Sequence, residues 1–319
     1  MQPLVSIICP TYNHEKYIAD AIEGFLMQKV DFPIEIIIHD DASTDSTAAI
    51  IRDYEKKYPD IIRPIYQKEN QYSKGITAAN FVYKKALGKY IASCEGDDYW
   101  TDPYKLKKQV EFLENHPEYI AVTHNVKVID GNNELIDDNF NEFKIFDEHV
   151  YTLKDAEKLK MPFQTASKMY RNIWLDMPER VFKKYIKCKA NGDRKNALIL
   201  ALMGEVYCMA DIMAVHRKIV TFGDSWAARH YGKNMIFHQY NTIKELNKFA
   251  MNAFDVKLDN EEIKIKIITN AIAKMIYHPN KENLKVVKEI LKISDERKDD
   301  IFKYLMSRGI RKIKKIIIK

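Results

Sequence analysis

Apolar and polar positions along the first hundred residues predict strands and helices in turn. Short continuous apolar runs are typical of strands covered on both faces, and they fall at residues 5–9, 34–38, 61–66 and 90–94. Between them, apolar residues spaced three and four apart predict amphipathic helices, the second of which Ser43 is expected to cap. This alternation predicts right-handed crossovers and a mostly parallel sheet flanked by helices.

The pattern is less regular after about residue 103 and becomes purely helical further on. The predicted elements of the middle part are a helix at 105–115, a strand at 120–129, a helix at 195–203 and a strand at 206–215. The predicted C-terminal helices are 234–253, 261–277, 282–293 and 295–307. Glycines near 225–232 interrupt the pattern, so we expect an α/β domain over 1–228 and a helical C-terminal region over 229–319.

Composition narrows the class of protein. With 46% hydrophobic and 30% charged residues, and only ten Gly and ten Pro in 319 residues, the chain differs from collagen-like, low-complexity and disordered sequences. No apolar run approaches the roughly 20 residues of a membrane span, and the first residues lack the basic start of a signal peptide. The cysteines are widely separated, which argues against a disulfide framework or a zinc site and fits a reducing cytoplasm. They are Cys9, Cys94, Cys188 and Cys208.

Basic charge is concentrated at the C-terminus. The chain has 51 Lys and Arg against 45 Asp and Glu, and residues 303–319 hold seven of the basic residues and no acidic one. The rest is close to neutral, whereas nucleic-acid binders more often spread basic residues over a folded face, so no nucleic-acid partner is expected. Residues 301–319 place apolar and basic side chains on opposite helical faces. This pattern predicts peripheral contact with the inner face of the cell membrane or, equally, an ordinary terminal helix packed on the protein.

Polar residues follow three predicted strands where each strand ends. They are Pro-Thr-Tyr-Asn at 10–13, the pair Asp40 and Asp41, and Glu-Gly-Asp-Asp-Tyr-Trp at 95–100. Ligands of parallel α/β sheets bind beyond the carboxyl ends of strands, so we expect these residues to converge. Gathered carboxylates repel one another unless a cation lies among them, which favours a divalent ion and a phosphate-bearing substrate. The alternative is a set of solvated turns whose carboxylates cap helices.

Four motifs in this order resemble the inverting family-2 glycosyltransferases of the GT-A fold. They are Val-Ser-Ile-Ile-Cys-Pro-Thr-Tyr-Asn at 5–13, Asp-Asp-Ala-Ser-Thr-Asp at 40–45, the group Asn70, Gly75 and Asn80, and the pair Asp97-Asp98. The resemblance covers about residues 3–225. It implies a Rossmann-like, mostly parallel sheet with flanking helices, a nucleotide-sugar half over 1–100 and an acceptor half over 101–228.

The resemblance also implies an activity. A metal-dependent inverting enzyme of this kind moves a hexose or N-acetylhexosamine from a UDP-sugar to a hydroxyl of a glycan or lipid-linked acceptor. It forms a β-linkage, uses Mn²⁺ or Mg²⁺, and serves surface polysaccharide or lipopolysaccharide synthesis in bacteria. One alternative is a nucleotidyltransferase, although such enzymes usually carry a Gly-rich basic loop where this chain has Pro-Thr-Tyr-Asn-His-Glu. The other is a catalytically inactive, sugar-nucleotide-binding scaffold, against which the retained acidic pairs argue.

The resemblance assigns nucleotide-binding roles to the first two strand ends. Asp41 would hydrogen-bond the uracil edge, Tyr12 would stack on the base, and Thr11 would lie nearby in a loop that Pro10 and Asn13 complete.

At the fourth strand end, Asp98 would bind the metal, and Asp97 the ribose or a metal-linked water. Glu95-Gly96-Asp97 also has the spacing of a D-x-D element, so Glu95 stays a candidate ligand. Lys74, in the loop before the third helix, is a candidate contact of the donor phosphates; the plainer interpretation is a solvated lysine.

Asp193 is the candidate catalytic base. Inversion requires a carboxylate opposite the leaving group to take the proton of the acceptor hydroxyl. Asp193 opens a predicted helix about 95 residues past Asp97-Asp98, where the family places its base. From the residues alone, the alternative is a routine helix N-cap, and both roles can hold together.

Further candidates come from residue types near the expected site. Trp100 would form an apolar wall for the donor sugar or, equally, pack in the core. Gln164 and Thr165 would hydrogen-bond an acceptor sugar. His216 and Arg217 lie where related enzymes complete the metal or diphosphate site; the alternative for His216 is a packed histidine at a strand end.

Overall fold

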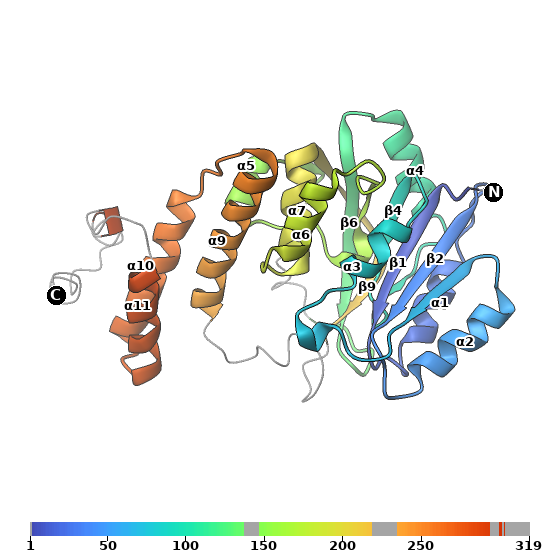
Figure 1. Cartoon of the computed structure of the whole chain (residues 1–319), viewed down its shortest axis with the longest axis horizontal. Coiled ribbons are helices and arrows are strands. Elements are labelled where there is room, and N and C mark those ends of the chain that lie inside the picture. Colours follow the sequence, from blue (N-terminus) through green and yellow to red (C-terminus); the bar gives the residue numbers. More distant parts are fainter. Residues whose placement is uncertain (1, 137–146, 219–234, 294–299, 302, 304–319) are drawn as a thin grey trace.

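A computed structural model describes residues 2–136, 147–218, 235–293, 300, 301 and 303 (Figure 1). The first part of the chain alternates strands and helices, as the apolar runs predict. Its elements are β1 (Val5–Thr11), α1 (Ile18–Leu26), β2 (Ile34–Asp40), α2 (Thr47–Lys57), β3 (Ile62–Tyr66), the 3₁₀ turn η1 (Tyr72–Lys74), α3 (Ala79–Val82), η2 (Tyr83–Lys85) and β4 (Tyr90–Ser93).

The middle part adds short strands and further helices, and the last part is helical. The middle elements are β5 (Tyr99–Trp100), α4 (Lys105–Asn115), β6 (Tyr119–Ile129), β7 (His149–Tyr151), α5 (Leu153–Glu157), η4 (Thr165–Ser167), β8 (Met169–Arg171), α6 (Glu179–Lys187), α7 (Gly192–Met203) and β9 (Glu205–Arg217). The C-terminal helices are α9 (Met235–Phe254), α10 (Glu261–Tyr277) and α11 (Lys281–Ile293).

The described strands form one sheet in the order β3-β2-β1-β4-β8-β6-β9-β5, with β7 paired to β9. The pairs β1–β2, β2–β3 and β1–β4 are parallel, so the strand order reverses direction at β1. Antiparallel pairing begins where β8 joins β4 and β6. The expected α/β fold with flanking helices is confirmed, and the point of reversal lies between the β1 and β4 loops, where such sheets bind ligands.

Two local predictions were wrong. Ser46, not Ser43, occupies the N-cap position of α2, and Ser43 instead donates its hydroxyl to Asp40 Oδ1 at 2.5 Å. The apolar residues Ala79, Phe81, Val82 and Ala86 predict a third helix that ends at Gly88. The helix is shorter, because the chain tightens into η2 and then passes close to β1. A Cβ added at Gly88 would lie 2.5 Å from the backbone nitrogen of Ser6, so the chain needs glycine at this approach.

Alternate residues of the central strands pack into cores on the two faces of the sheet. Ile7 and Cys9 of β1 belong to one cluster with apolar residues of α1 and α4, and Ile8 belongs to a second cluster with residues of α6 and α7. This alternation is the period of two that a strand covered on both faces requires. Packing on both faces therefore stabilises the sheet, and the edge that carries the loops is the part available for a functional site.

The helix α9 connects the sheet domain to the C-terminal helices. Its Leu246 and Phe249 belong to the core cluster of α6 and α7, while its Tyr240 and Ile243 pack with α10 and α11. In Figure 1, α9 accordingly lies between these two groups. The expected boundary at 228/229 and most of the expected helix at 295–307 fall outside the described residues.

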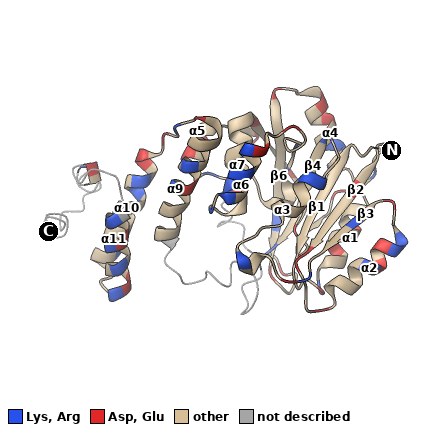
Figure 2. Cartoon of the chain, in the orientation of Figure 1, with Lys and Arg blue, Asp and Glu red and all other residues tan. Residues whose placement is uncertain are grey.

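The described helices show no membrane-crossing candidate, since none combines the necessary length with sufficient apolar character. Figure 2 shows basic and acidic residues interspersed along α2, α10 and α11. The basic, amphipathic part of 301–319 that could contact a membrane lies outside the described residues, apart from residues 301 and 303.

Candidate active site

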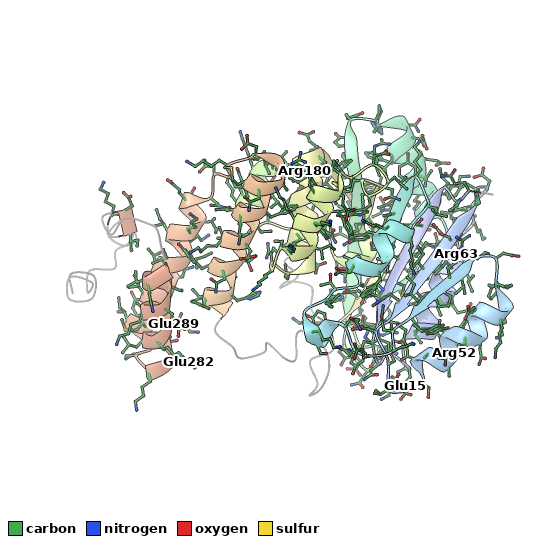
Figure 3. All side chains as sticks on the ribbon, viewed as in Figure 1. Glu15, Arg52, Arg63, Arg180, Glu282 and Glu289 are labelled. Carbon is green, nitrogen blue, oxygen red and sulfur yellow. The ribbon has the colours of Figure 1, made fainter. Side chains whose placement is uncertain are left out.

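The loops after β1 and β2 fasten to each other at the carboxyl edge of the sheet. The backbone N–H of Asn13 donates to Ser43 Oγ at 2.9 Å, and Asn13 Oδ1 accepts from the N–H of Thr44 at 2.8 Å. Asn13 has φ of 56°, a left-handed conformation that asparagine tolerates better than most residues. Figure 3 labels Glu15 of the same loop, at the end of the sheet where these loops gather.

Asp41 is buried and holds the segment after β3. Its Oδ1 accepts from the N–H of Gln71 at 2.8 Å and its Oδ2 from the N–H of Tyr72 at 3.0 Å, while Asn70 donates to its carbonyl. The structure thus places Asp41 at the predicted edge, in a loop-anchoring role that the sequence did not predict.

The other nucleotide-binding candidates lie around the same edge. Thr11 Oγ1 is 3.1 Å from His14 Nδ1, and Pro10 and Tyr12 are half-buried beside it in the chain. Lys74 ends η1 and is exposed, with its Nζ paired to the Glu69 carboxylate. These contacts agree with the plainer interpretation of Lys74 as a solvated lysine.

The carboxylates of Glu95, Asp97 and Asp98 come together after β4. One oxygen from each lies within 4.8 Å of the others, and we call these three residues the acidic cluster. Gly96 lets the loop after β4 lie close to the end of β1, because a Cβ there would lie 2.5 Å from Thr11 Oγ1. The loops after β1 and β4 are therefore in tight contact, as the parallel sheet predicts.

Burial and mutual repulsion raise the pKa of two carboxyl groups in the acidic cluster. Burial, together with the neighbouring charges of Asp193, Asp97 and Asp98, raises the pKa of Glu95 well above its ordinary value. Burial and Asp98 also raise the pKa of Asp97, against the opposing effect of His14, whose Nε2 is 3.8 Å from an Asp97 oxygen. Such mutual destabilisation is what a bound cation would relieve.

Asp98 is the most enclosed member of the cluster, only 1% exposed. Gln164 Nε2 donates to its Oδ2 at 2.7 Å, the backbone N–H of Arg217 donates to its Oδ1 at 2.8 Å, and His216 Nδ1 is 3.1 Å from Oδ1. Burial lowers the pKa of His216, but the cluster carboxylates outweigh it and raise that pKa to about 9. The structure therefore brings His216 to the predicted metal site.

The Arg217 guanidinium is occupied by the protein itself. It donates to the Asp97 carbonyl at 2.8 Å and to Asp20 Oδ2 at 2.6 Å, and it lies 4.7 and 4.8 Å from the ring centroids of Tyr17 and Tyr99. The side chain is 2% exposed. Arg217 thus braces the acidic-cluster loop, and the diphosphate contact expected of it stays a prediction.

Trp100 packs in the core and does not line the site. It is 1% exposed, its ring meets Phe25 edge-on at 4.8 Å, and its Nε1 donates to the Ala166 carbonyl at 2.9 Å. A ring this enclosed presents no face to a sugar, so the expected sugar wall is wrong and the alternative of core packing holds.

Asp193 is the second residue of α7 and is exposed. The cap of this helix is Asn191, whose side chain accepts from the N–H of Arg194 at 3.0 Å. The plain N-cap interpretation of Asp193 is therefore wrong. Instead, Asp193 Oδ1 accepts a hydrogen bond from Thr165 Oγ1 at 3.0 Å, and its charge acts on Glu95 across the same edge.

Gln164 and Thr165 are buried and face acidic side chains. Gln164 contacts Asp98 and Thr165 contacts Asp193, and the acceptor-sugar contact expected of both residues stays a prediction. No role was predicted for His14. Its position three residues after Thr11, in the loop that follows the first strand, could have indicated that it lies at the site.

Comparison with known proteins assigns the family and the fold. The sequence model described as "Glycosyl transferase family 2" matches residues 6–173. The chain is 39% identical over 222 residues to Uncharacterized protein Rv1520 of Mycobacterium tuberculosis, covering 67% of this chain and 58% of that relative's length. It is 37% identical over 122 residues, 38% of this chain and 45% of the relative, to the Escherichia coli UDP-Glc:alpha-D-GlcNAc-diphosphoundecaprenol beta-1,3-glucosyltransferase WfaP.

Among solved structures, the crystal structure of S. aureus TarS 1-349 in complex with UDP-GlcNAc has the same fold. Its TM-score is 0.57 with 18% sequence identity, over 90% of this chain and 79% of that one.

Proposed function

This chain belongs to glycosyl transferase family 2, and from that premise we propose that it moves a hexose or N-acetylhexosamine from a UDP-sugar to a sugar hydroxyl with inversion. The observation that carries the proposal is the acidic cluster, three carboxylates within 4.8 Å, together with Asp193 of α7, whose charge acts on Glu95. The relationship to WfaP, whose name gives a UDP-Glc donor and a lipid-linked GlcNAc acceptor, supports the same kind of donor and acceptor here.

The residues fit a divalent cation. Mg²⁺ and Mn²⁺ favour carboxylate oxygens, and burial together with repulsion between carboxylates raises the pKa of Glu95 and Asp97, which marks the cluster as short of positive charge. Asp98 would hold the ion with help from Asp97 or Glu95, and His216 Nδ1 lies within reach. When bound, the ion supplies Lewis-acid stabilisation of the diphosphate leaving group.

The chain's own residues account for the rest of the reaction. Asp41 and the loop of Thr11, Tyr12 and Asn13 would hold the uridine at the neighbouring strand ends. Asp193 Oδ2 would take the proton as the acceptor oxygen attacks the anomeric carbon and the bond to the diphosphate breaks. Attack opposite the leaving group turns an α-linked UDP-sugar into a β-glycoside.

The two alternative functions have less support. A nucleotidyltransferase is disfavoured by the family match. An inactive scaffold would have no need of an exposed carboxylate at Asp193 that is not used as a helix cap.

The test combines binding and product analysis. Purified protein is screened by thermal shift against UDP-sugars with and without Mn²⁺, and UDP-glucose and UDP-N-acetylglucosamine are then offered with N-acetylglucosaminyl-diphosphoundecaprenol. We expect a Mn²⁺-dependent rise in Tm with the preferred donor and a β-linked product by NMR. An α-linked product, or no shift with any UDP-sugar, would contradict the proposal.

We also propose that the enzyme acts in surface polysaccharide synthesis from the cytoplasmic side, with residues 301–319 in peripheral contact with the membrane. Seven basic residues in 303–319 support this through attraction to anionic lipid, about 1 kcal/mol for each residue near the surface. Deleting 303–319 should lower binding to anionic liposomes and leave donor hydrolysis unchanged; unchanged liposome binding would refute the membrane role.

A further inference from the structure

Residues of the turn η4 contact both the proposed metal ligand Asp98 and the proposed base Asp193. Gln164, its N-cap, donates through Nε2 to Asp98 at 2.7 Å, and the next residue, Thr165, donates through Oγ1 to Asp193 at 3.0 Å. The two carboxylates lie 95 residues apart in the sequence but are contacted by consecutive residues. The backbone of these two consecutive residues therefore helps to set the distance between the acidic cluster and Asp193.

This turn is fixed by buried contacts from three elements. Its Ala166 carbonyl accepts from Trp100 Nε1 and its Ser167 carbonyl accepts from Gln109 Nε2, each at 2.9 Å. The Ser167 hydroxyl is 2.7 Å from the Thr123 hydroxyl. Thr165 itself is 9% exposed, and its β-branched side chain has few rotamers. The hydroxyl that meets Asp193 is therefore held in place by the protein.

The Asp193 carboxylate accepts a hydrogen bond from that hydroxyl. Its side chain projects from the exposed first turn of α7 and could otherwise occupy several staggered rotamers. Among the described residues, Thr165 is the hydrogen-bond donor that this carboxylate meets. With Oδ1 engaged, Oδ2 is left to accept a proton.

We propose that Thr165 is a positioning residue that fixes the Asp193 carboxylate at the distance from the acidic cluster required for in-line attack on the donor sugar. The proposal rests on the proposed function, because it gives Asp193 the role of base. Small displacements of a reacting group lower the rate steeply. Loss of the hydroxyl should therefore reduce turnover and leave donor binding unchanged.

The experiment compares Thr165→Val, which keeps the shape and removes the donor, with Thr165→Ser, which keeps the donor. Thr269→Val is the matched control, since Thr269 is 1% exposed and donates to a backbone carbonyl within α10, far along the chain. The readouts are kcat and donor KM with UDP-glucose or UDP-N-acetylglucosamine, UDP affinity by calorimetry with Mn²⁺, and Tm.

We expect Thr165→Val to lower kcat by about tenfold or more, an increase of about 1.4 kcal/mol in the barrier. Donor KM and UDP affinity should stay within about twofold, and Thr165→Ser should recover most of the turnover. Thr269→Val should lower Tm without lowering kcat. A Thr165→Val enzyme with wild-type kcat, or a serine variant as impaired as the valine variant, would overturn the inference while leaving the proposed function standing.

A crystal structure of Thr165→Val tests, independently of activity, whether Thr165 positions the Asp193 carboxylate. We expect the Asp193 carboxylate in a different rotamer or in several conformers. An unmoved, singly ordered carboxylate would overturn the positioning role. If the wild-type protein transfers no sugar, the proposed function fails separately, and the structure of the variant still tests whether Thr165 holds Asp193.

Discussion

Lys105 is a buried lysine close behind the acidic-cluster loop. Its Nζ donates to Gln109 Oε1 at 2.7 Å and lies 4.1 Å from the ring centroid of Trp100. Burial lowers its pKa from 10.5 to about 7, and the neighbouring Cys94 and Asp102 oppose this shift only in part. The folded protein therefore releases this proton at a lower pH than the unfolded chain does, which makes stability depend on pH.

Lys105→Met should stabilise the protein most at low pH. Below pH 7 the lysine is charged in both states, so the full cost of burying the charge is present. From pH 7 to 10.5 only the unfolded chain holds the proton, and the cost falls by about 1.4 kcal/mol per pH unit. Urea unfolding from pH 6 to pH 10 measures this difference in the free energy of unfolding.

Lys107→Met is the control for this measurement, since the Lys107 side chain is 45% exposed on the same helix. A stability difference between Lys105→Met and wild type that stayed constant across the pH range would contradict a neutral buried lysine.

At the scale of elements, α7 presents Asp193 and depends on Asn191 as its cap. Asn191→Ala should lower the free energy of unfolding by about 1 kcal/mol, the usual loss for an N-cap. It should also lower turnover, because the first turn that carries Asp193 is loosened. Denaturant unfolding and steady-state kinetics measure the two effects.

The control is Asn191→Asp, which preserves a capping side chain. Equal turnover in the alanine and aspartate variants would show that the order of this first turn does not matter for the reaction.

Strands could be predicted from the sequence where the local pattern of apolar residues is long enough to identify them. The strands β1, β2 and β4 have continuous apolar runs that need no partner to be recognised. The strands β5, β7 and β8 have only two or three residues, so a pattern of alternation cannot appear, and their existence depends on antiparallel partners distant in the sequence. The sequence therefore predicts the longer strands in both halves of the sheet, including β6 and β9, and misses the short strands β5, β7 and β8.

The site follows the same division. Carboxylates at the ends of parallel strands could be placed together, because the direction of the strands fixes their edge. The bond from Gln164 to Asp98 spans 66 residues and that from Arg217 to Asp20 spans 197. Both depend on the second half of the sheet, so the roles of Gln164 and Arg217 could not be inferred from residue type and spacing.

At the scale of the molecule, α9 makes the C-terminal helices part of one structure with the sheet domain. Phe249 is 3% exposed, belongs to the core cluster of α6 and α7, and lies 6.0 Å from Tyr185 between ring centroids. Phe249→Ala should lower the free energy of unfolding by about 3–5 kcal/mol, the usual range for a buried phenylalanine.

Met251→Ala provides the comparison, because Met251 is 43% exposed on the same helix and its loss should change stability little. Chemical denaturation followed by tryptophan fluorescence reports on the sheet domain through the buried Trp100 and Trp174, once Trp226 is replaced by phenylalanine in every protein compared. Unfolding of that domain at the wild-type denaturant concentration in Phe249→Ala would show that α9 is an independent unit.

In the proposed function the carboxylates have two separate roles. The acidic cluster would hold a cation and the diphosphate, and Asp193 would act on the acceptor. Calorimetric titration of UDP with Mn²⁺ into wild type, Asp98→Asn and Asp193→Asn tests this most directly. We predict Mn²⁺-dependent affinity within about twofold of wild type for Asp193→Asn, and a loss of at least about tenfold, or 1.4 kcal/mol, for Asp98→Asn. Wild-type affinity in Asp98→Asn, or lost affinity in Asp193→Asn, would contradict it.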